Sequence, residues 1–336
     1  MDLSSLAAFG HRVVYGGPRH TQAEPITPAL LEELERGAIL DPDHVPGELA
    51  VAELFLHRFP RTVHVACFDT AFHRDMPRVA QLFAIPRRYY EEEGIRRYGF
   101  HGLSYAFLLG ELARLAGPEA AHGRLVLAHL GAGSSMAAVR NGTCVDTTMA
   151  LTPVAGLVMA TRSGDLDPGL LIHLLQRGLS VGQLNDLVNQ RSGLLGVSGT
   201  TSDMKALLER ERTDTSAAEA VELYCQQAAK YAAAMAVAAG GLDTLVFSAG
   251  IGERSPAIRA RICARLALLG IRIDAATNSV GAPIISAADS SVTVRVIATN
   301  EELSIAQETL AMLDSHRTTT TNQKPARTAK TRPRWR

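Results

Sequence analysis

The sequence predicts an α/β protein with two domains. Its 336 residues are enough for two domains with sizeable cores. Residues 124–149 carry three apolar runs separated by a Gly/Ser turn and an Asn-Gly turn, which is typical of antiparallel strands joined by hairpins. Residues 242–270 show a strand, a Gly-x-Gly loop and an amphipathic helix in succession. Because such strands and helices alternate along most of the chain, the predicted fold class is α/β.

The first third of the chain alternates between short strands and helices. Residues 8–17 predict a strand that ends in a Gly-Gly turn, and residues 61–73 predict a buried strand. Helices are predicted at 28–37, where Pro begins and Gly ends the segment, and at 46–57. Apolar residues at helical spacing predict a further helix after residue 102.

The pattern continues after the hairpins. A helix is predicted to begin near Asp167, and a long helix is predicted over residues 216–238. Residues 181–205 predict a helix, then a glycine-broken loop, then a helix cap at Ser202-Asp203. Residues 291–313 predict an alternating strand followed by a closing helix.

Composition and charge favour a cytoplasmic globular protein. Hydrophobic residues make up 46% of the chain and charged residues 20%, and no apolar stretch is long enough to span a membrane. The first residues do not match a secretory signal, and the four scattered cysteines show neither metal spacing nor a disulfide framework. Residues 317–336 hold seven Lys and Arg and no acid, so the rest of the chain is acidic. We expect this tail to be a disordered extension; the alternative is a nucleic-acid-binding arm, against which the acidic remainder argues.

Four features are candidates for chemistry. The Gly/Ser turn at 131–135 could cradle an anion with its backbone N–H groups, or it could be an ordinary hairpin turn. Arg12 and Arg162 lie near glycines, where an arginine suits either an anion or a salt bridge. Asp69 at the end of a strand fits a catalytic acid or a helix cap. His101 at a helix entrance fits a ligand-binding or a structural role.

Short motifs lie in order along residues 8–313. They are GHRVVYGG, FDTAFH, RRYGFHG, HLGAGSS, TPVAGLVMATRSGDLDP, SGLLGVSG with SDMK, FSAGIGERS and TNEELSIAQET. In order and spacing this series resembles the acetate kinase family. The resemblance implies the two-domain actin-like ATPase fold of acetate and sugar kinases. It also implies reversible phosphoryl transfer from ATP to acetate, giving ADP and acetyl phosphate, with Mg²⁺ as cofactor and a homodimer as the assembly.

The resemblance also implies roles for individual residues. The catalytic positions match Asp69, His101 and Arg162. The substrate-binding positions match Arg12, Val14, Phe100 and Pro153, and Glu301 matches a carboxylate on the magnesium side. The nucleotide-binding positions match His129, Leu130, Gly131, Ala132, Gly133, Asp203, Met204, Lys205, Gly250, Ile251, Gly252, Glu253 and Arg254.

The same resemblance implies how the chain is divided. Residues 1–122 would form an incomplete first α/β domain, completed by the closing helix at 301–314. Residues 123–314 would form the second α/β domain with the nucleotide loops, and residues 315–336 a disordered basic tail.

The chemistry is consistent with these assignments. Phosphoryl transfer needs in-line positioning and positive charge around the transferred group, which two arginines and a histidine can provide together with Mg²⁺. Acetate is already ionised at pH 7, so no general base is required. We therefore expect Asp69 to orient Arg12 or His101 rather than to remove a proton.

The sequence departs from the family pattern in several places. The family's first strand and its Asn/Ser phosphate loop have no counterpart before Arg12, so we expect a first domain truncated at its N-terminus and little or no kinase activity. Ala132 replaces an Asn of the phosphate loop, and Asp43 stands where the family has a Leu at its acid pocket. A His, a His and a Glu of the family are replaced by Tyr15, Tyr105 and Ala155. The alternative functions are a propionate or other short-chain acyl kinase, a catalytically inactive homologue, and a nucleic-acid binder.

Overall fold

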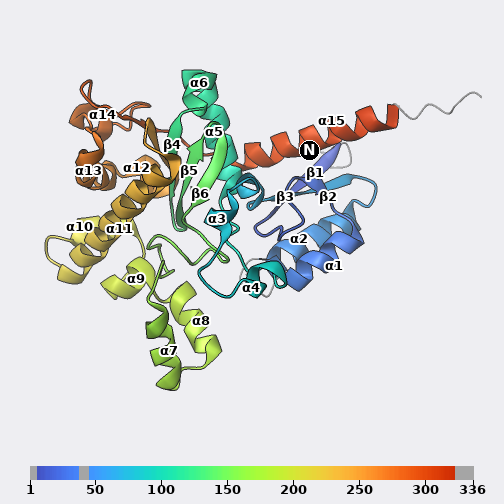
Figure 1. The fold of residues 1–336 in the computed structure, drawn as a ribbon, viewed down its shortest axis with the longest axis horizontal. Coiled ribbons are helices and arrows are strands. Elements are labelled where there is room, and N and C mark those ends of the chain that lie inside the picture. Colours follow the sequence, from blue (N-terminus) through green and yellow to red (C-terminus); the bar gives the residue numbers. More distant parts are fainter. Residues whose placement is uncertain (1–5, 38–44, 322–336) are drawn as a thin grey trace, which may run out of the picture.

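The computed structural model describes residues 6–37 and 45–321, with side chains up to residue 315. It confirms an α/β chain with two separate β-sheets (Figure 1). Asp43 and residues 322–336 lie outside the described residues, so the expectations placed on them stay predictions. Within the described part, no helix is both long and apolar enough to cross a membrane.

The first sheet has three strands in the order β1-β3-β2. Strand β1 (Ala8–Val13) runs parallel to β3 (Val63–Phe68), and the short β2 (Glu24–Pro25) pairs antiparallel with β3. Side chains of β3 alternate between two cores: Ala66 and Phe68 face α1 (Pro28–Gly37) and α2 (Val45–Arg58), whereas Val65 and Cys67 pack with Met312 of α15 (Glu301–Thr321). Helices therefore cover both faces of this sheet.

The closing helix α15 crosses β1 at very close range. A Cβ atom on Gly10 would lie 2.5 Å from both Ile305 Cγ2 and Thr309 Oγ1, so only glycine fits at that crossing. Residues from the two ends of the chain are thereby packed side by side (Figure 1).

The second sheet has five strands in the order β6-β5-β4-β7-β8. The predicted hairpins are confirmed as β4 (Arg124–Leu130), β5 (Ser134–Arg140) and β6 (Thr143–Thr147). Strands β7 (Thr244–Ser248) and β8 (Thr293–Val296) extend the sheet in parallel with β4. Helix α11 (Thr215–Ala239) and helix α13 (Pro256–Arg265) cover one face, and α5 (Gly102–Ala116) covers the other.

Helix α5 belongs to the cores of both sheets. Its Leu103 packs with Val65 and Met312 beside the first sheet, and its Leu108 and Leu112 pack against the second sheet. The helix thereby holds the carboxyl ends of β1, β3 and β4 in one region, which is where open α/β sheets bind ligands.

Shorter helices complete the described fold. They are η3 (Ala71–His73), α3 (Arg78–Gln81), α4 (Arg88–Glu91), α6 (Pro118–Ala121), α7 (Pro168–Gln176), α8 (Val181–Gln190), α9 (Gly193–Ser198), α10 (Met204–Arg210), α12 (Ala249–Arg254), η4 (Ala267–Leu269) and α14 (Ala275–Ser279).

Three local predictions were wrong. The expected loop between α8 and α10 contains helix α9, and the expected Gly-x-Gly loop after β7 is helix α12. Helix α15 continues to Thr321, so the tail does not begin at residue 315. In α9 and α12, hydrogen bonds with residues distant in the sequence stabilise a helix that its glycines alone disfavour.

Candidate active site

A cavity of about 580 Å³ opens at the carboxyl ends of β1 and β3, facing the turn between β4 and β5. Nine of the predicted site residues line it. They are Arg12, Val14, Asp69, Phe100, His101, Ala132, Gly133, Pro153 and Arg162. The lining also contains five residues that were not among the predicted site residues, namely Ala160, Thr161, Asn189, Gln190 and Ser202.

Arg12 and Asp69 form a two-bond ion pair at the wall of this cavity. Arg12 Nε and Nη2 donate to the two Asp69 carboxylate oxygens at 3.2 and 2.6 Å. The parallel register of β1 and β3 brings both residues to the same sheet edge, and Asp69 N donates to Val13 O at 3.1 Å. Asp69 is buried, whereas 37% of the Arg12 side chain is exposed. The carboxylate raises the pKa of Arg12 further, so Asp69 orients a permanently charged arginine, which is one of the two alternatives that the sequence left open.

His101 is placed by an unusual backbone conformation at the start of α5. It occupies the N-cap position of the helix with a backbone φ of 57°, in the left-handed region. The conformation is supported from both sides. His73 Nε2 lies 3.0 Å from Phe100 O, and a Cβ on Gly102 would meet Asp69 O at 1.9 Å. Helix α5 therefore begins directly on the end of β3, with the His101 imidazole in the cavity.

Gly133 lies between His101 and Arg162. A Cβ at this position would be 3.2 Å from His101 Nε2 and 3.7 Å from Arg162 Nη1. The two side chains thus converge on the same point of the β4–β5 turn. A glycine leaves room there for a ligand to approach the backbone.

His101 is stacked on His129, with ring centroids 4.1 Å apart and planes 20° from parallel. Burial lowers the pKa of His129 to about 4 and, with His129 beside it, lowers the pKa of His101 well below the usual value. Both imidazoles are consequently neutral at pH 7. Arg12 and Arg162 supply the positive charge of the cavity, and His101 contributes a hydrogen-bonding group.

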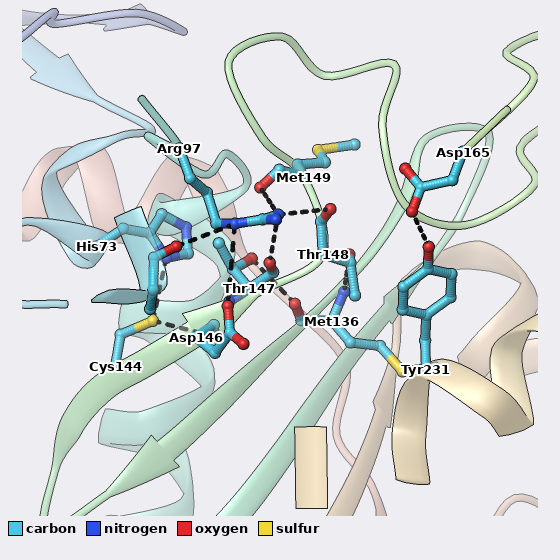
Figure 2. A network of polar contacts seen from close by, with 11 residues as sticks. His73, Arg97, Met136, Cys144, Asp146, Thr147, Thr148, Met149, Asp165 and Tyr231 are labelled. Carbon is cyan, nitrogen blue, oxygen red and sulfur yellow. Dashed lines mark hydrogen bonds and ion pairs between the residues drawn. The ribbon is translucent and has the colours of Figure 1, made fainter. Parts of the chain in front are cut away.

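The loop at residues 148–165, which carries Pro153 and Arg162, is held at both ends (Figure 2). At its start, Arg97 Nη1 donates to the backbone oxygens of residues 147, 148 and 149 at 2.9, 3.2 and 3.2 Å. At its end, Asp165 accepts from the Tyr231 hydroxyl and from Gly156 N. Arg97 lies inside the RRYGFHG motif, but its role depends on contacts about 50 residues away and was missed.

The turn between β4 and β5 presents only part of the predicted nucleotide loop to the cavity. Ala132 and Gly133 line it, whereas Leu130 is in the core and His129 lies behind His101. Ala160 N donates to Ala132 O at 3.0 Å, which fixes the turn to the loop that carries Arg162.

The other predicted nucleotide contacts lie outside the cavity lining. Asp203 caps α10 by accepting from Ala206 N at 2.7 Å; Met204 beside it is buried and Lys205 is exposed. Residues 250–254 form most of α12. Glu253 accepts from Ala249 N at 2.7 Å and from Thr299 N at 3.1 Å, so its carboxylate is used inside the protein.

A buried arginine that the sequence did not indicate stabilises the end of α12. Arg259 donates to the carbonyl oxygens of Gly252 and Glu253 at 2.9 and 2.7 Å, and also to Asn278. These bonds pair the last turn of α12, which would otherwise end with free carbonyls.

Glu301 lies in the first turn of α15, 3.7 Å from Arg12. Burial raises the pKa of this carboxyl, and Arg12 counteracts that shift. Within the described residues, no group of three His, Cys, Asp or Glu side chains could hold a metal ion by itself. A metal bound here would need further ligands from its substrate and from water.

Comparisons with known proteins point to one family. A family model described as the Acetokinase family matches residues 1–307. The acetate kinase of Chromobacterium violaceum is 44% identical over 313 residues, 91% of this chain and 79% of that protein, and acetate kinase 1 of Vibrio cholerae is 43% identical over 91% and 78%.

Solved structures give the same result for the fold. The acetate kinase of Porphyromonas gingivalis has a TM-score of 0.86 at 36% identity, with 93% of this chain and 79% of that chain covered. A propionate kinase from Francisella tularensis has a TM-score of 0.86 at 38% identity, with 90% and 78% covered. This likeness confirms the predicted fold class.

Proposed function

The chain belongs to the acetokinase family, and on that basis we propose that it transfers the terminal phosphoryl group of ATP to acetate, reversibly, giving ADP and acetyl phosphate. The observation that carries the proposal is the convergence of Arg162 and His101 on Gly133, in a cavity that also holds Arg12. Positive charge and donors around a transferred phosphoryl group are what this chemistry requires.

The acid would bind where the cavity is apolar. Val14, Phe100 and Pro153 are buried side chains that line it, and Arg12 lies beside them. A carboxylate suits the Arg12 guanidinium, and a methyl group suits the apolar wall. Short-chain acids are therefore the proposed acceptors. Propionate is the second candidate, because a propionate kinase is among the similar structures.

The transfer itself would need no general base, since the acid is ionised at pH 7. Arg162 would stabilise the charge on the phosphoryl oxygens, and neutral His101 would donate a hydrogen bond. Asp69 uses both carboxylate oxygens on Arg12, so its proposed role is to hold Arg12 in place.

ATP would be bound by the β4–β5 turn, the start of α10 and helix α12. Mg²⁺ usually takes one or two protein carboxylates and completes its shell with phosphate oxygens and water. Glu301, half-buried beside the cavity, fits that pattern with a metal that arrives with ATP. The ion would neutralise charge on the leaving ADP. A cytoplasmic location and a homodimer are further proposals that rest on the family.

The test is a direct assay of the purified chain. Acetyl phosphate formed from ATP and acetate is trapped as the hydroxamate, and propionate and butyrate are compared as acceptors. The reverse reaction is followed as ATP formed from acetyl phosphate and ADP. We expect turnover that needs Mg²⁺ and is highest with acetate; such turnover would also show that the sequence-based expectation of little or no kinase activity is wrong. A monodisperse, folded protein that turns over none of these acids would contradict the proposal.

A further inference from the structure

Two buried hydroxyl groups stand behind His101, on the side away from the cavity. Tyr105, on α5, and Ser135, on β5, are both fully buried, and their oxygens are 2.5 Å apart. Ser135 Oγ lies 2.8 Å from His101 Nδ1. The three groups form a continuous chain of hydrogen bonds that ends at the ring nitrogen opposite the cavity.

The direction of these bonds follows from counting donors. Among the described residues, the Tyr105 hydroxyl has Ser135 Oγ as its one hydrogen-bond partner. A buried hydroxyl proton without an acceptor is costly, so Tyr105 donates to Ser135. Ser135 Oγ then has its own proton left for its second partner, His101 Nδ1. A neutral imidazole that accepts at Nδ1 carries its proton at Nε2.

Nε2 is also the nitrogen that faces the cavity. It is the His101 atom nearest to a Cβ built on Gly133, at 3.2 Å. Stacking on His129 restricts rotation of the ring, because His129 is itself held by a bond between its Nδ1 and Ser104 Oγ at 2.9 Å. The ring plane is thus set by His129 of β4, and the protonated nitrogen by Tyr105 of α5 through Ser135 of β5.

We propose that Tyr105 and Ser135 are positioning residues, which hold His101 as its Nε2–H tautomer with that N–H directed at the phosphoryl group beside Gly133. The part of this inference that concerns transfer rests on the proposed kinase reaction. Burial raises the pKa of Tyr105 above its ordinary value, so the phenol remains a donor throughout the neutral range. Tyr105 stands where the family pattern has a histidine, so the phenol donor is a departure from that pattern.

The first test observes the tautomer and needs no activity. Long-range ¹H–¹⁵N spectra of histidine-labelled protein distinguish Nε2–H from Nδ1–H rings, and a His101→Asn variant assigns the signal. We expect the Nε2–H form in the wild-type protein. Ser135→Ala removes the donor to His101 Nδ1, and Tyr105→Phe leaves the Ser135 oxygen free to accept from Nδ1–H. We therefore expect a measurable share of the Nδ1–H form in both variants. A wild-type His101 in the Nδ1–H form would overturn the proposal.

The second test uses kinetics with a matched control. Tyr224 is equally buried, and its hydroxyl lies 3.0 Å from Ser134 Oγ on the neighbouring position of β5. Tyr105→Phe is expected to lower kcat about three- to tenfold without changing KM for ATP or acetate, as the loss of one buried hydrogen bond implies. Tyr224→Phe should lower stability by a similar amount and kcat much less.

The outcomes separate the two proposals. Equal kcat losses in Tyr105→Phe and Tyr224→Phe would overturn the positioning role. If Tyr105→Phe does not fold, Ser135→Ala takes its place in both tests. A wild-type chain without kinase activity would contradict the proposed function, and the tautomer and its response to Ser135→Ala would still decide this inference.

Discussion

Arg97 is expected to control catalysis without lining the cavity, because it anchors the loop that carries Arg162 (Figure 2). We predict that Arg97→Ala lowers both the free energy of unfolding and kcat. Arg97 Nη1 faces three successive backbone oxygens at the start of this loop, and Nε donates to Ala80 O at 3.2 Å.

The magnitude follows from these contacts. Nη1 has two hydrogens, so the four contacts amount to about three bonds from a charged donor, each contributing about 1.5–3 kcal/mol at most. The Arg97 side chain is 25% exposed, so water can replace part of this hydrogen bonding to the carbonyl oxygens when the side chain is removed. We expect a loss of about 3 kcal/mol in the free energy of unfolding. A shift of about 1 Å in Arg162 would lower kcat about ten- to a hundredfold.

The neighbouring Arg96 provides a matched control. It donates to Gln81 at 2.9 Å and lies over the Tyr98 ring, away from the carbonyl oxygens that Arg97 binds. Urea unfolding and acetyl phosphate formation would be measured for both alanine variants. If Arg97→Ala retains kcat within about twofold of Arg96→Ala, the loop does not depend on Arg97 and the reasoning is refuted.

Three further predictions concern the cavity and the buried histidines. Arg162→Ala should lower kcat by about 10²–10³ with little change in KM for ATP, compared with the exposed Arg177→Ala; unchanged turnover would remove Arg162 from the catalytic residues. Val14→Ala should raise kcat/KM for propionate relative to acetate, by about tenfold and at most a few hundredfold; an unchanged ratio would mean that other residues line the acid pocket. Burial lowers the pKa of His11, His73 and His129 to about 4, against about 6.5 in an unfolded chain. The unfolded state therefore binds more protons than the folded state between about pH 4 and pH 6.5. The stability that these neutral histidines contribute should therefore be fully present above about pH 6.5. The free energy of unfolding should fall towards pH 4, by at most about 1.4 kcal/mol per pH unit for each histidine. Urea unfolding at several pH values checks this, and a flat profile over that window would contradict it.

Local sequence patterns were sufficient for most of the elements. The Asn-Gly turn and the alternating apolar runs at 124–149 predicted three strands, because turn geometry and strand periodicity depend on near neighbours. The Asp203 cap and the long helix at 216–238 were predicted for the same reason. Helices α9 and α12 were missed, since their glycines favour loops unless distant groups such as Arg259 pair the helix end.

The candidate site divides in the same way. Residue types in ordered motifs indicated Arg12, Asp69, His101 and Arg162, and the structure brings these four to one cavity. The sequence left open whether Asp69 orients Arg12 or His101, and only the parallel register of β1 and β3 decided for Arg12.

The supporting contacts came from the tertiary structure alone. Arg97 reaches backbone oxygens 50 residues away, and the chain from Tyr105 through Ser135 to His101 joins α5 to β5 across 30 residues or more. No local pattern encodes such pairs, because their geometry exists only after two sheets have packed on one helix. The sequence by itself determined which residues can carry charge and donate hydrogen bonds; packing decided which are neutral, which are oriented, and which point into the cavity.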